Sequence, residues 1–261
     1  MKYVIDHDLH IHSHLSSCSG DLHQTPEAIL DYARQNGFKH ICLTDHFWDE
    51  TVPGASDWYK PQNYAHIKKS LPLPMAEGIT FHFGCETEMD RFSTVGISRK
   101  VLDELDFVIV PTSHLHMTGF TIEADDTSVT HRAKYYMERN HSLLDMDLPF
   151  KKMGLAHFTS CLDTNCEGSR DDILNAITDV EYAEFFERLA QCGMGLELNT
   201  PLADVSSQSA LRPYRIARSC GCKFYLGSDA HGPDGLNKAH ARFQAIVDAL
   251  GLTEDDKFSF V

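Results

Sequence analysis

The sequence predicts an α/β fold in which seven parallel strands form a closed or nearly closed barrel. Three observations predict this fold: short apolar runs recur along the chain, helix-like stretches separate several of them, and histidine or carboxylate residues follow almost every run. Alternating strands and helices within one domain are typical of a parallel sheet. A doubly wound open sheet is the alternative, and in both architectures ligands bind beyond the carboxyl ends of the strands.

The expected strands are short and rich in Val, Ile, Leu and Phe, which is typical of parallel strands buried on both faces. In chain order they cover residues 3–6, 40–44, 80–85, 107–111, 154–156, 195–198 and 224–227. Seven strands in this alternating pattern favour the barrel over the open sheet.

The helices between these strands have recognisable ends. Thr25 is expected to cap a helix that starts at Pro26 and stops at Gly37. Later helices are expected to end at Gly193, Gly221 and Gly251, and a further helix is expected over about residues 128–144. Residues 48–74 are rich in Pro, Trp and Tyr and are expected to form a long loop that serves as a lid or pocket wall.

Composition sets the class of protein. The 261 residues, 42% of them hydrophobic, suit one large domain over residues 1–261 with a substantial core. The formal charge of −15 argues against binding to long nucleic acids or anionic membranes, which favour basic surfaces. No apolar run approaches the roughly 20 residues that span a bilayer, and the first residues lack the apolar core of a secretory signal. The eight cysteines include no CxxC pair, so we expect reduced, mostly buried thiols in a cytoplasmic protein.

Residue types that bind metals gather where the expected strands end. Strand by strand they are His10 and His12, Asp45 and His46, Glu86 and Glu88, His114 and His116, His157, Glu197 and Asn199, and Asp229 and His231. A barrel brings these ends to one rim. An isolated histidine is usually a hydrogen-bonded structural residue, but a set on successive strands predicts a polynuclear metal centre. Mixed imidazole and carboxylate ligands suit zinc, manganese or iron.

The ordered motifs DLHIH, TDH, a strand-end Glu, SH, AH and GSDAH resemble those of the PHP (polymerase and histidinol phosphatase) superfamily. The resemblance covers nearly the whole chain. It implies a distorted (β/α)7 barrel of the PHP type, which agrees with the strand count. It also implies a metal-dependent phosphoesterase with two or three divalent ions, and zinc, manganese and iron all suit the ligand set.

Carried over by position, the resemblance implies three metal sites. The first would use His10, His12, Glu86 and Asp229, and the second would share Glu86 and add His114 and His157. The third would use His46 and His231 with a residue shortly after the first motif, where the family commonly has His or Asp and this chain has Cys18. A thiolate can bind zinc, so Cys18 is the expected ligand, with Asp21 and His23 as alternatives. Asp8 and Asp45 are expected to orient ligand imidazoles.

The implied reaction is hydrolysis of a phosphate ester by water. Two metal ions a few ångströms apart can lower the pKa of a shared water, which then attacks phosphorus in line. The sequence contains neither a GxSxG elbow nor a Walker loop, so acyl-enzyme and P-loop chemistry are not expected. Candidates for protonating the leaving oxygen are Asp229, His231 and His116, and candidates for binding the phosphate are Arg91, Arg132 and Arg170.

The function expected first is hydrolysis of a small phosphomonoester, of which histidinol phosphate is the most specific form. The chain length and the segment from His12 to His46 resemble the stand-alone histidinol phosphatases, whereas VPTSHLHMTGF departs from their fourth motif. A nuclease or phosphodiesterase acting on short nucleotides is one alternative. An amidohydrolase is disfavoured because no lysine occurs at the strand ends, and a non-catalytic metal-binding scaffold is the alternative of another class.

Overall fold

Eight parallel strands form a barrel in the computed structural model, which describes residues 1–199 and 205–259. The strands are β1 (His7–Ile11), β2 (His40–Leu43), β3 (His46–Phe47), β4 (Thr80–Thr87), β5 (Phe107–Pro111), β6 (Met153–Ala156), β7 (Gly195–Asn199) and β8 (Phe224–Gly227). Their order in the sheet is β1-β2-β4-β5-β6-β7-β8, and the short β3 pairs with the last part of β4. The predicted seven-stranded parallel sheet is therefore confirmed, with β3 as an addition.

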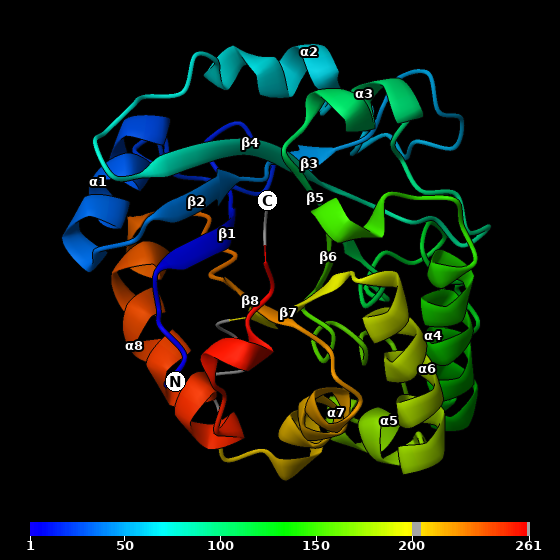
Figure 1. The fold of residues 1–261 in the computed structure, drawn as a ribbon. Helices are drawn as coiled ribbons and strands as arrows, with labels where there is room; N and C mark the ends of the chain where they lie inside the picture. Colours follow the sequence, from blue (N-terminus) through cyan, green and yellow to red (C-terminus); the bar gives the residue numbers. More distant parts are fainter. Residues whose placement is uncertain (200–204, 260–261) are drawn as a thin grey trace.

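The two ends of the sheet meet. The Asp229 amide donates to the His10 carbonyl at 2.8 Å, and the His12 amide donates to the Ala230 carbonyl at 3.1 Å. These bonds join the chain at β1 to the chain just after β8, so the barrel prediction is correct and the open-sheet alternative is wrong. Figure 1 shows the strands arranged in a ring with helices around it.

The prediction for the first strand is wrong in position. Residues 3–6 were expected from their apolar character, whereas β1 covers His7–Ile11 and contains buried polar side chains. This polar strand is stable because its side chains have partners. The Asp8 carboxylate accepts from the amides of His10 at 3.3 Å and Ser228 at 2.9 Å. The first histidines therefore lie within the strand and directly after it.

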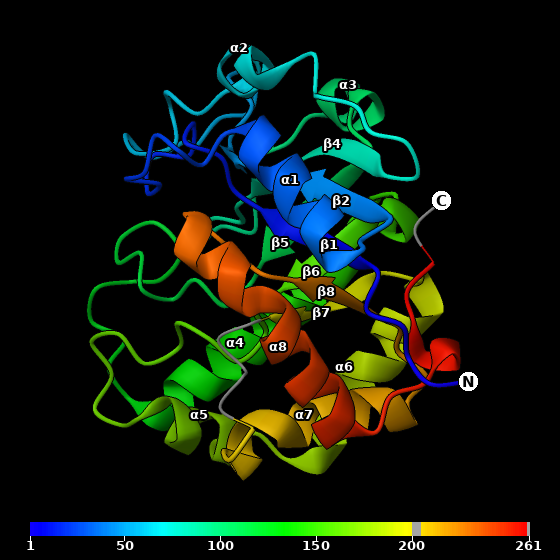
Figure 2. The same ribbon diagram turned by 90° about the vertical axis from the view of Figure 1, so that its left-hand side faces the viewer.

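The helices lie on the outside of the barrel (Figures 1 and 2). They are α1 (Pro26–Asn36), α2 (Tyr64–Ile67), α3 (Arg99–Glu104), α4 (Val129–Leu144), α5 (Arg170–Ala176), α6 (Asp179–Cys192), α7 (Gln208–Ser219) and α8 (Pro233–Leu250), with 3-10 turns at Lys68–Ser70, Phe150–Lys152 and Glu254–Asp256. The predicted caps of α1 are confirmed: the Thr25 hydroxyl accepts from the Ala28 amide, and Gly37 adopts φ 69°. The short helices α2, α3 and α5 were not predicted.

The ends of the later helices agree closely with the sequence. α6 and α8 stop at the predicted glycines Gly193 and Gly251, both in the left-handed conformation. α7 stops earlier than predicted, at Ser219 with Cys220 as its cap, and Gly221 follows with φ 85°. The glycines thus mark the turn out of each helix, because they adopt a positive φ without steric cost.

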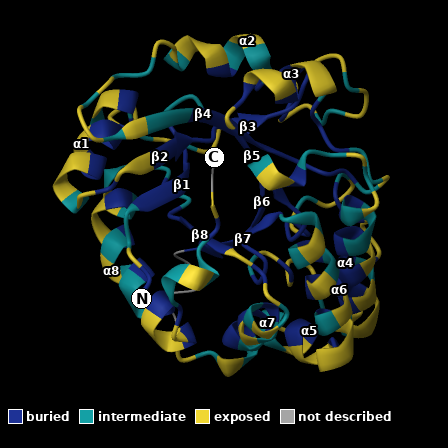
Figure 3. Ribbon diagram, in the orientation of Figure 1, coloured by how far each residue is buried: buried dark blue, intermediate teal, exposed yellow. Residues whose placement is uncertain are grey.

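A packed core fills the barrel at the N-terminal ends of the strands. Figure 3 shows the strands buried and the helices exposed on their outer faces. The rings of Phe107 on β5 and Tyr225 on β8 meet edge to face with centroids 5.3 Å apart, although these strands are not neighbours in the sheet. Phe258 packs against both rings, and its amide donates to the Phe224 carbonyl at 2.8 Å. The segment around Phe258 therefore covers the N-terminal ends of the strands.

The cysteines are all free thiols. Cys42, Cys85 and Cys222 are buried, whereas Cys18 and Cys161 are exposed, so the expectation of mostly buried thiols holds for only part of the set. Among the residues that the structure describes, no helix has the length and apolar character needed to cross a membrane.

Close strand packing at Gly84 provides a test of the fold. A Cβ atom at Gly84 would lie 2.2 Å from the Phe107 carbonyl oxygen and 2.9 Å from the Cys42 sulfur, so Gly84→Ala must displace β4 from β5. We expect a loss of at least about 1–3 kcal/mol in the free energy of unfolding, measured by urea denaturation. Gly20→Ala is the matched control, because nothing lies within 4 Å of the added atom. Equal stability of the two variants would contradict the packing of β4 on β5.

Candidate metal centre

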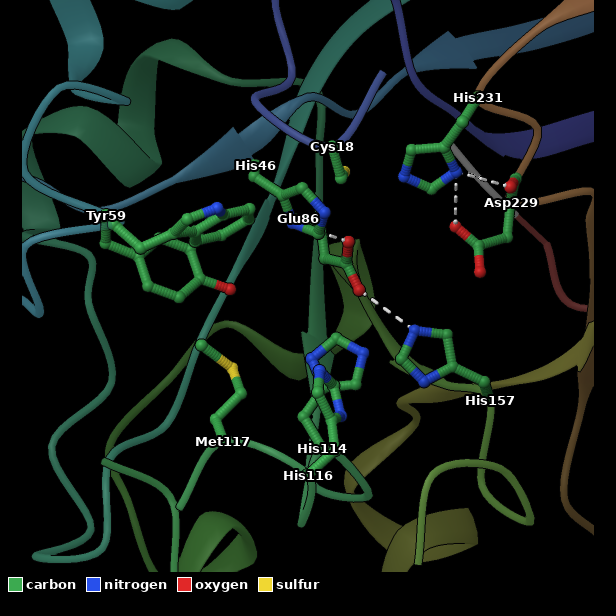
Figure 4. A pocket seen from close by; sticks show the side chains of 11 residues that line it. Cys18, His46, Tyr59, Glu86, His114, His116, Met117, His157, Asp229 and His231 are labelled. Carbon is green, nitrogen blue, oxygen red and sulfur yellow. Dashed lines mark hydrogen bonds and ion pairs between the residues drawn. The ribbon is translucent and has the colours of Figure 1, made fainter. Parts of the chain in front are cut away.

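The carboxyl ends of the strands bring the predicted residues together. β1 contributes His10 and is followed by His12, β3 contributes His46, β4 contributes Glu86, β6 is followed by His157, and the chain after β8 contributes Asp229 and His231. His114 comes from the loop after β5. Figure 4 shows the side chains of several of these residues directed toward one cavity.

Glu86 lies at the middle of this cluster. Its Oε2 is 3.3 Å from His12 Nε2 and 3.0 Å from His46 Nδ1. The same oxygen is 3.5 Å from His10 Nε2, and Oε1 is 3.0 Å from His157 Nε2. The carboxylate is completely buried and therefore contacts imidazoles in place of water.

Asp229 lies against the same pair of histidines. Its Oδ1 is 3.4 Å from His10 Nε2 and 3.2 Å from His12 Nε2. Two carboxylates and two ring nitrogens thus face each other within a few ångströms. This is the set that the resemblance implied for the first metal site.

Three groups of ring nitrogens and carboxylate oxygens are compact enough to hold metal ions. The groups are His10, His12 and Glu86; Glu86, His114 and His157; and His12, His46 and His231, and within each group the ligand atoms lie within 4.8 Å of one another. The second group matches the predicted second site. In the third, His12 completes the set where Cys18 was expected.

Hydrogen bonds at the far side of most of these rings fix which nitrogen faces the cavity. His10 Nδ1 is 2.5 Å from Glu197 Oε1, so this nitrogen carries a proton. His12 Nδ1 donates to the Ser16 hydroxyl at 2.9 Å, because that hydroxyl in turn donates to Asp45 at 2.7 Å. The two Nε2 atoms then face each other at 3.0 Å. Such a pair is stable only with a proton or a metal ion between the nitrogens.

The other rings are oriented in the same way. His114 Nδ1 donates to Glu88 at 2.8 Å, and His231 Nδ1 donates to the Asp229 carbonyl at 2.9 Å. His157 Nδ1 is 3.1 Å from the Ser113 hydroxyl. Histidines that bind metals commonly donate their second N–H to such a partner, which fixes the tautomer and the ring orientation.

Two buried atoms in the centre have no hydrogen-bond partner. They are Glu86 Oε2 and His46 Nδ1, which lie 3.0 Å apart without the geometry of a hydrogen bond. Buried polar atoms are nearly always satisfied, and a bound cation would satisfy both. The donor set and these unpartnered atoms therefore fit divalent metal ions.

The backbone at two of these residues is strained. His157 has φ 27° and Asp229 has φ 53°, which are left-handed values that residues other than glycine rarely adopt. Each such residue costs on the order of 1–3 kcal/mol and persists only where the surroundings enforce it. Strain at two strand ends that face the same cavity supports a functional role for both side chains.

Burial and ion pairing act in opposite directions on the pKa values of the buried groups in the cluster. Burial alone would raise the pKa of Glu86, but the imidazoles of His46 and His10 bring it well below its ordinary value. Burial opposes charge on His12, yet the Asp229 and Glu86 carboxylates raise its pKa to about 9. The carboxylates stay ionised and attract cations to the cluster, so protons and metal ions compete for the same ring nitrogens.

A cavity of about 400 Å³ opens beside the cluster. It is lined by Cys18, His46, Trp58, Tyr59, Glu86, His114, His116, Met117, His157, Asp229 and His231. Cys18 borders this cavity but belongs to none of the three compact groups found among the described residues. Cys18 is exposed as a residue, but partial desolvation of its sulfur beside the cavity raises the pKa of the thiol to about 12, with Glu86 and Asp229 acting in the same direction.

Comparison with known proteins agrees with this geometry. A family model described as "PHP domain" matches residues 8–201. The chain belongs to the PHP domain family. A protein of Caldicellulosiruptor saccharolyticus described as a probable phosphatase is 23% identical over 225 residues, which cover 86% of this chain and 80% of that protein.

A solved structure has a similar fold. The crystal structure of histidinol phosphate phosphatase from Lactococcus lactis, complexed with zinc, L-histidinol and phosphate, gives a TM-score of 0.57 at 19% sequence identity. The match covers 97% of this chain and 98% of that chain. The similarity supports the barrel of the PHP type along almost the whole chain.

The candidate arginines of this PHP domain lie outside the cavity lining. Arg132 is buried, and its guanidinium donates to the carbonyls of Leu162, Thr164 and Asp126, which indicates a structural role. Arg91 pairs with Glu123 at 2.8 Å and lines a separate hollow with Phe92 and Phe120. Arg170 pairs with Asp171 and lines a third hollow with Ser160 and Cys161. These arginines were chosen because they lie in segments that follow strands, and this position in the sequence does not determine where a side chain points.

The orienting role of Glu197 was not predicted from the sequence. Glu197 accepts from His10 Nδ1 and, at 2.6 Å, from the His157 amide, so one carboxylate positions two residues of the centre. Its place at the end of β7 was the available signal. Asp45 acts on His12 through Ser16, as expected of an orienting residue, whereas Asp8 contacts backbone amides and the Tyr32 hydroxyl at 3.0 Å instead of an imidazole.

Removal of the Glu197 charge tests this orienting network in the PHP domain. We expect Glu197→Gln to lower zinc affinity about 10–100-fold, because Gln has one accepting oxygen where Glu197 uses two and carries no charge, so it cannot hold both His10 Nδ1 and the His157 amide. The measurement is competition with a chelating dye, and circular dichroism verifies the fold. Glu187→Gln, a change of the same kind on the exposed side of α6, is the control. Unchanged zinc affinity in Glu197→Gln would contradict the role of the network.

Proposed function

We propose that this chain is a metal-dependent phosphatase that hydrolyses small phosphomonoesters. The observation that carries the proposal is the convergence of six imidazoles and the carboxylates of Glu86 and Asp229 in one cluster of a PHP barrel, in which Glu86 Oε2 is buried and unpartnered. This chain has an open cavity beside the cluster. A non-catalytic scaffold would have no need of such a cavity.

The proposed metal ligands are the residues of the three compact groups together with Asp229. They would hold two or three divalent ions, with Glu86 shared between two groups. Cys18 lines the cavity and belongs to none of the groups. Zinc, manganese and iron all suit this donor set. Divalent ions held there would activate water for attack on phosphorus and offset the charge of the phosphate.

We assign delivery of the proton to the leaving oxygen to His116. Two of the three candidates are already engaged in the cluster. His231 donates its Nδ1 proton to a carbonyl and belongs to the same compact group as His12, and Asp229 contacts His10 and His12. The ring of His116 lines the cavity, stands edge-on to His114 and belongs to no compact group. Burial and His114 lower the pKa of His116 to about 4, and a phosphate dianion beside it would raise that pKa.

The proposed activity is tested by phosphate release from purified protein reconstituted with zinc, manganese or iron. The substrates are histidinol phosphate, sugar phosphates, nucleotides and a diester. Histidinol phosphate is included because the similar solved structure is that of a histidinol phosphate phosphatase. We expect the normal protein to hydrolyse the monoesters. We expect Glu86→Gln to bind less metal and to lower kcat by at least about 10³-fold, because one ligand charge disappears from the cluster. Preference for the diester would favour the phosphodiesterase alternative, and inactivity with every ester in the metal-loaded protein would favour the scaffold.

The role of His116 is tested with leaving groups of different basicity. We expect His116→Gln to lower kcat for an alkyl phosphate about 10²–10⁴-fold, because an alkoxide needs a proton. The same variant should hydrolyse p-nitrophenyl phosphate at nearly the normal rate, because nitrophenolate leaves without one. His131→Gln, at an exposed histidine on α4 outside the cavity lining, is the control. Equal losses for both esters would contradict the assignment.

A further inference from the structure

The cavity has two chemically different sides. Figure 4 shows Tyr59 and Met117 on the side opposite Asp229 and His157. Trp58 also lines the cavity, remains 38% exposed, and meets the Tyr59 ring edge to face with centroids 4.7 Å apart. Two aromatic rings and a thioether, which we name the Trp58–Tyr59–Met117 wall, therefore face the metal-type residues.

The hydroxyl of Tyr59 has no partner in this wall. The side chain is fully buried, and its oxygen makes no hydrogen bond of normal geometry, although the Glu88 carboxylate is close enough to interact with it. Figure 4 shows the hydroxyl directed into the cavity. A buried hydroxyl without a partner is costly, and an oxygen atom of a bound ligand would satisfy it. The hydroxyls of Tyr214 and Tyr225 are also unpartnered, but neither residue lines the cavity.

Tyr59 is held in place by packing. Its ring contacts Trp48 and Phe120 with centroids 6.0 and 5.7 Å apart, and its amide donates to the Ser56 carbonyl at 3.0 Å. A donor fixed in this way loses little entropy when a ligand binds. The loop expected to form a pocket wall therefore supplies a fixed hydrogen-bond donor.

The described lining of the cavity offers no free counter-charge for a second charged group on a substrate. None of these lining residues is Lys or Arg. Its two carboxylates, Glu86 and Asp229, are engaged with imidazoles. A charged group on the alcohol portion of a substrate would lose water without gaining a partner.

We propose that the Trp58–Tyr59–Met117 wall is the substrate-binding wall, at which the Tyr59 hydroxyl donates to a phosphoryl oxygen and the alcohol portion is an uncharged aromatic or apolar group. This proposal rests on the proposed phosphatase function. Tyr59 supplies the protein donor that the arginines outside the cavity do not, while Trp58 and Met117 contact the alcohol. A cavity of about 400 Å³ is at the small end of ligand pockets, which suits a phosphate with one ring.

The substrate class is tested by kcat/KM of the metal-loaded protein for alkyl phosphates with leaving groups of similar basicity. We expect 2-phenylethyl phosphate to exceed ethyl phosphate, phosphocholine, histidinol phosphate and glucose 6-phosphate by at least tenfold. Equal values would overturn the proposal and leave the phosphatase function intact. Preference for phosphocholine would show that the rings bind a cation and would also overturn it. Inactivity with every ester would overturn the phosphatase function and this proposal together.

The apolar contact is tested with Trp58→Ala and Met117→Ala. Each variant should raise KM for 2-phenylethyl phosphate about tenfold and change KM for ethyl phosphate less than twofold, and Trp58→Phe should restore most of the loss. Phe92→Ala is the matched control, because this ring is 72% exposed and lies outside the cavity lining. An equal rise in KM for both esters would overturn the contact with the alcohol.

The hydrogen bond is tested with Tyr59→Phe. We expect kcat/KM to fall 10–100-fold for both esters, while the thermal midpoint of the metal-free protein stays equal or rises because an unpartnered hydroxyl is removed. Tyr214→Phe removes another buried, unpartnered hydroxyl and should leave kcat/KM unchanged. Unchanged kcat/KM in Tyr59→Phe would overturn the hydrogen bond, and a lowered midpoint would show a structural role instead.

Discussion

The burial of one carboxylate, that of Glu86, is the constraint on which the rest of the centre depends. A negative charge removed from water must be surrounded by compensating groups, and here imidazoles from β1, β3 and the end of β6 lie within 3.5 Å of its oxygens. None of these groups is a neighbour of Glu86 in the sequence. The charge is therefore tolerable only when the barrel is closed, so the fold and the site form together.

The outer ring of hydrogen bonds decides what the cluster can do. Carboxylates and hydroxyls at the backs of the rings, such as Glu197 and Ser16, take the second N–H and leave the other nitrogen toward the cavity. Without them the same imidazoles could adopt other tautomers and satisfy one another. Coordination chemistry is thus specified largely by residues that never reach the cavity.

Strand ends were the strongest signal in the sequence, because parallel strands of a closed sheet must present their carboxyl ends at one rim. Residues such as His10, Glu86 and His157 could be placed on that basis. The position of β1 could not, because its polar side chains are stabilised by partners far away in the chain, including Ser228. Tyr59 was equally invisible, since a tyrosine in a long loop gives no sign that its hydroxyl lacks a partner.

The joining of β1 to the chain after β8 has a consequence for biosynthesis. His10 and His12 are synthesised more than two hundred residues before Asp229 and His231. The earlier part of a growing chain therefore lacks the Asp229 carboxylate that completes the surroundings of these imidazoles. The finished cluster can form only after β8 and the residues that follow it have been synthesised.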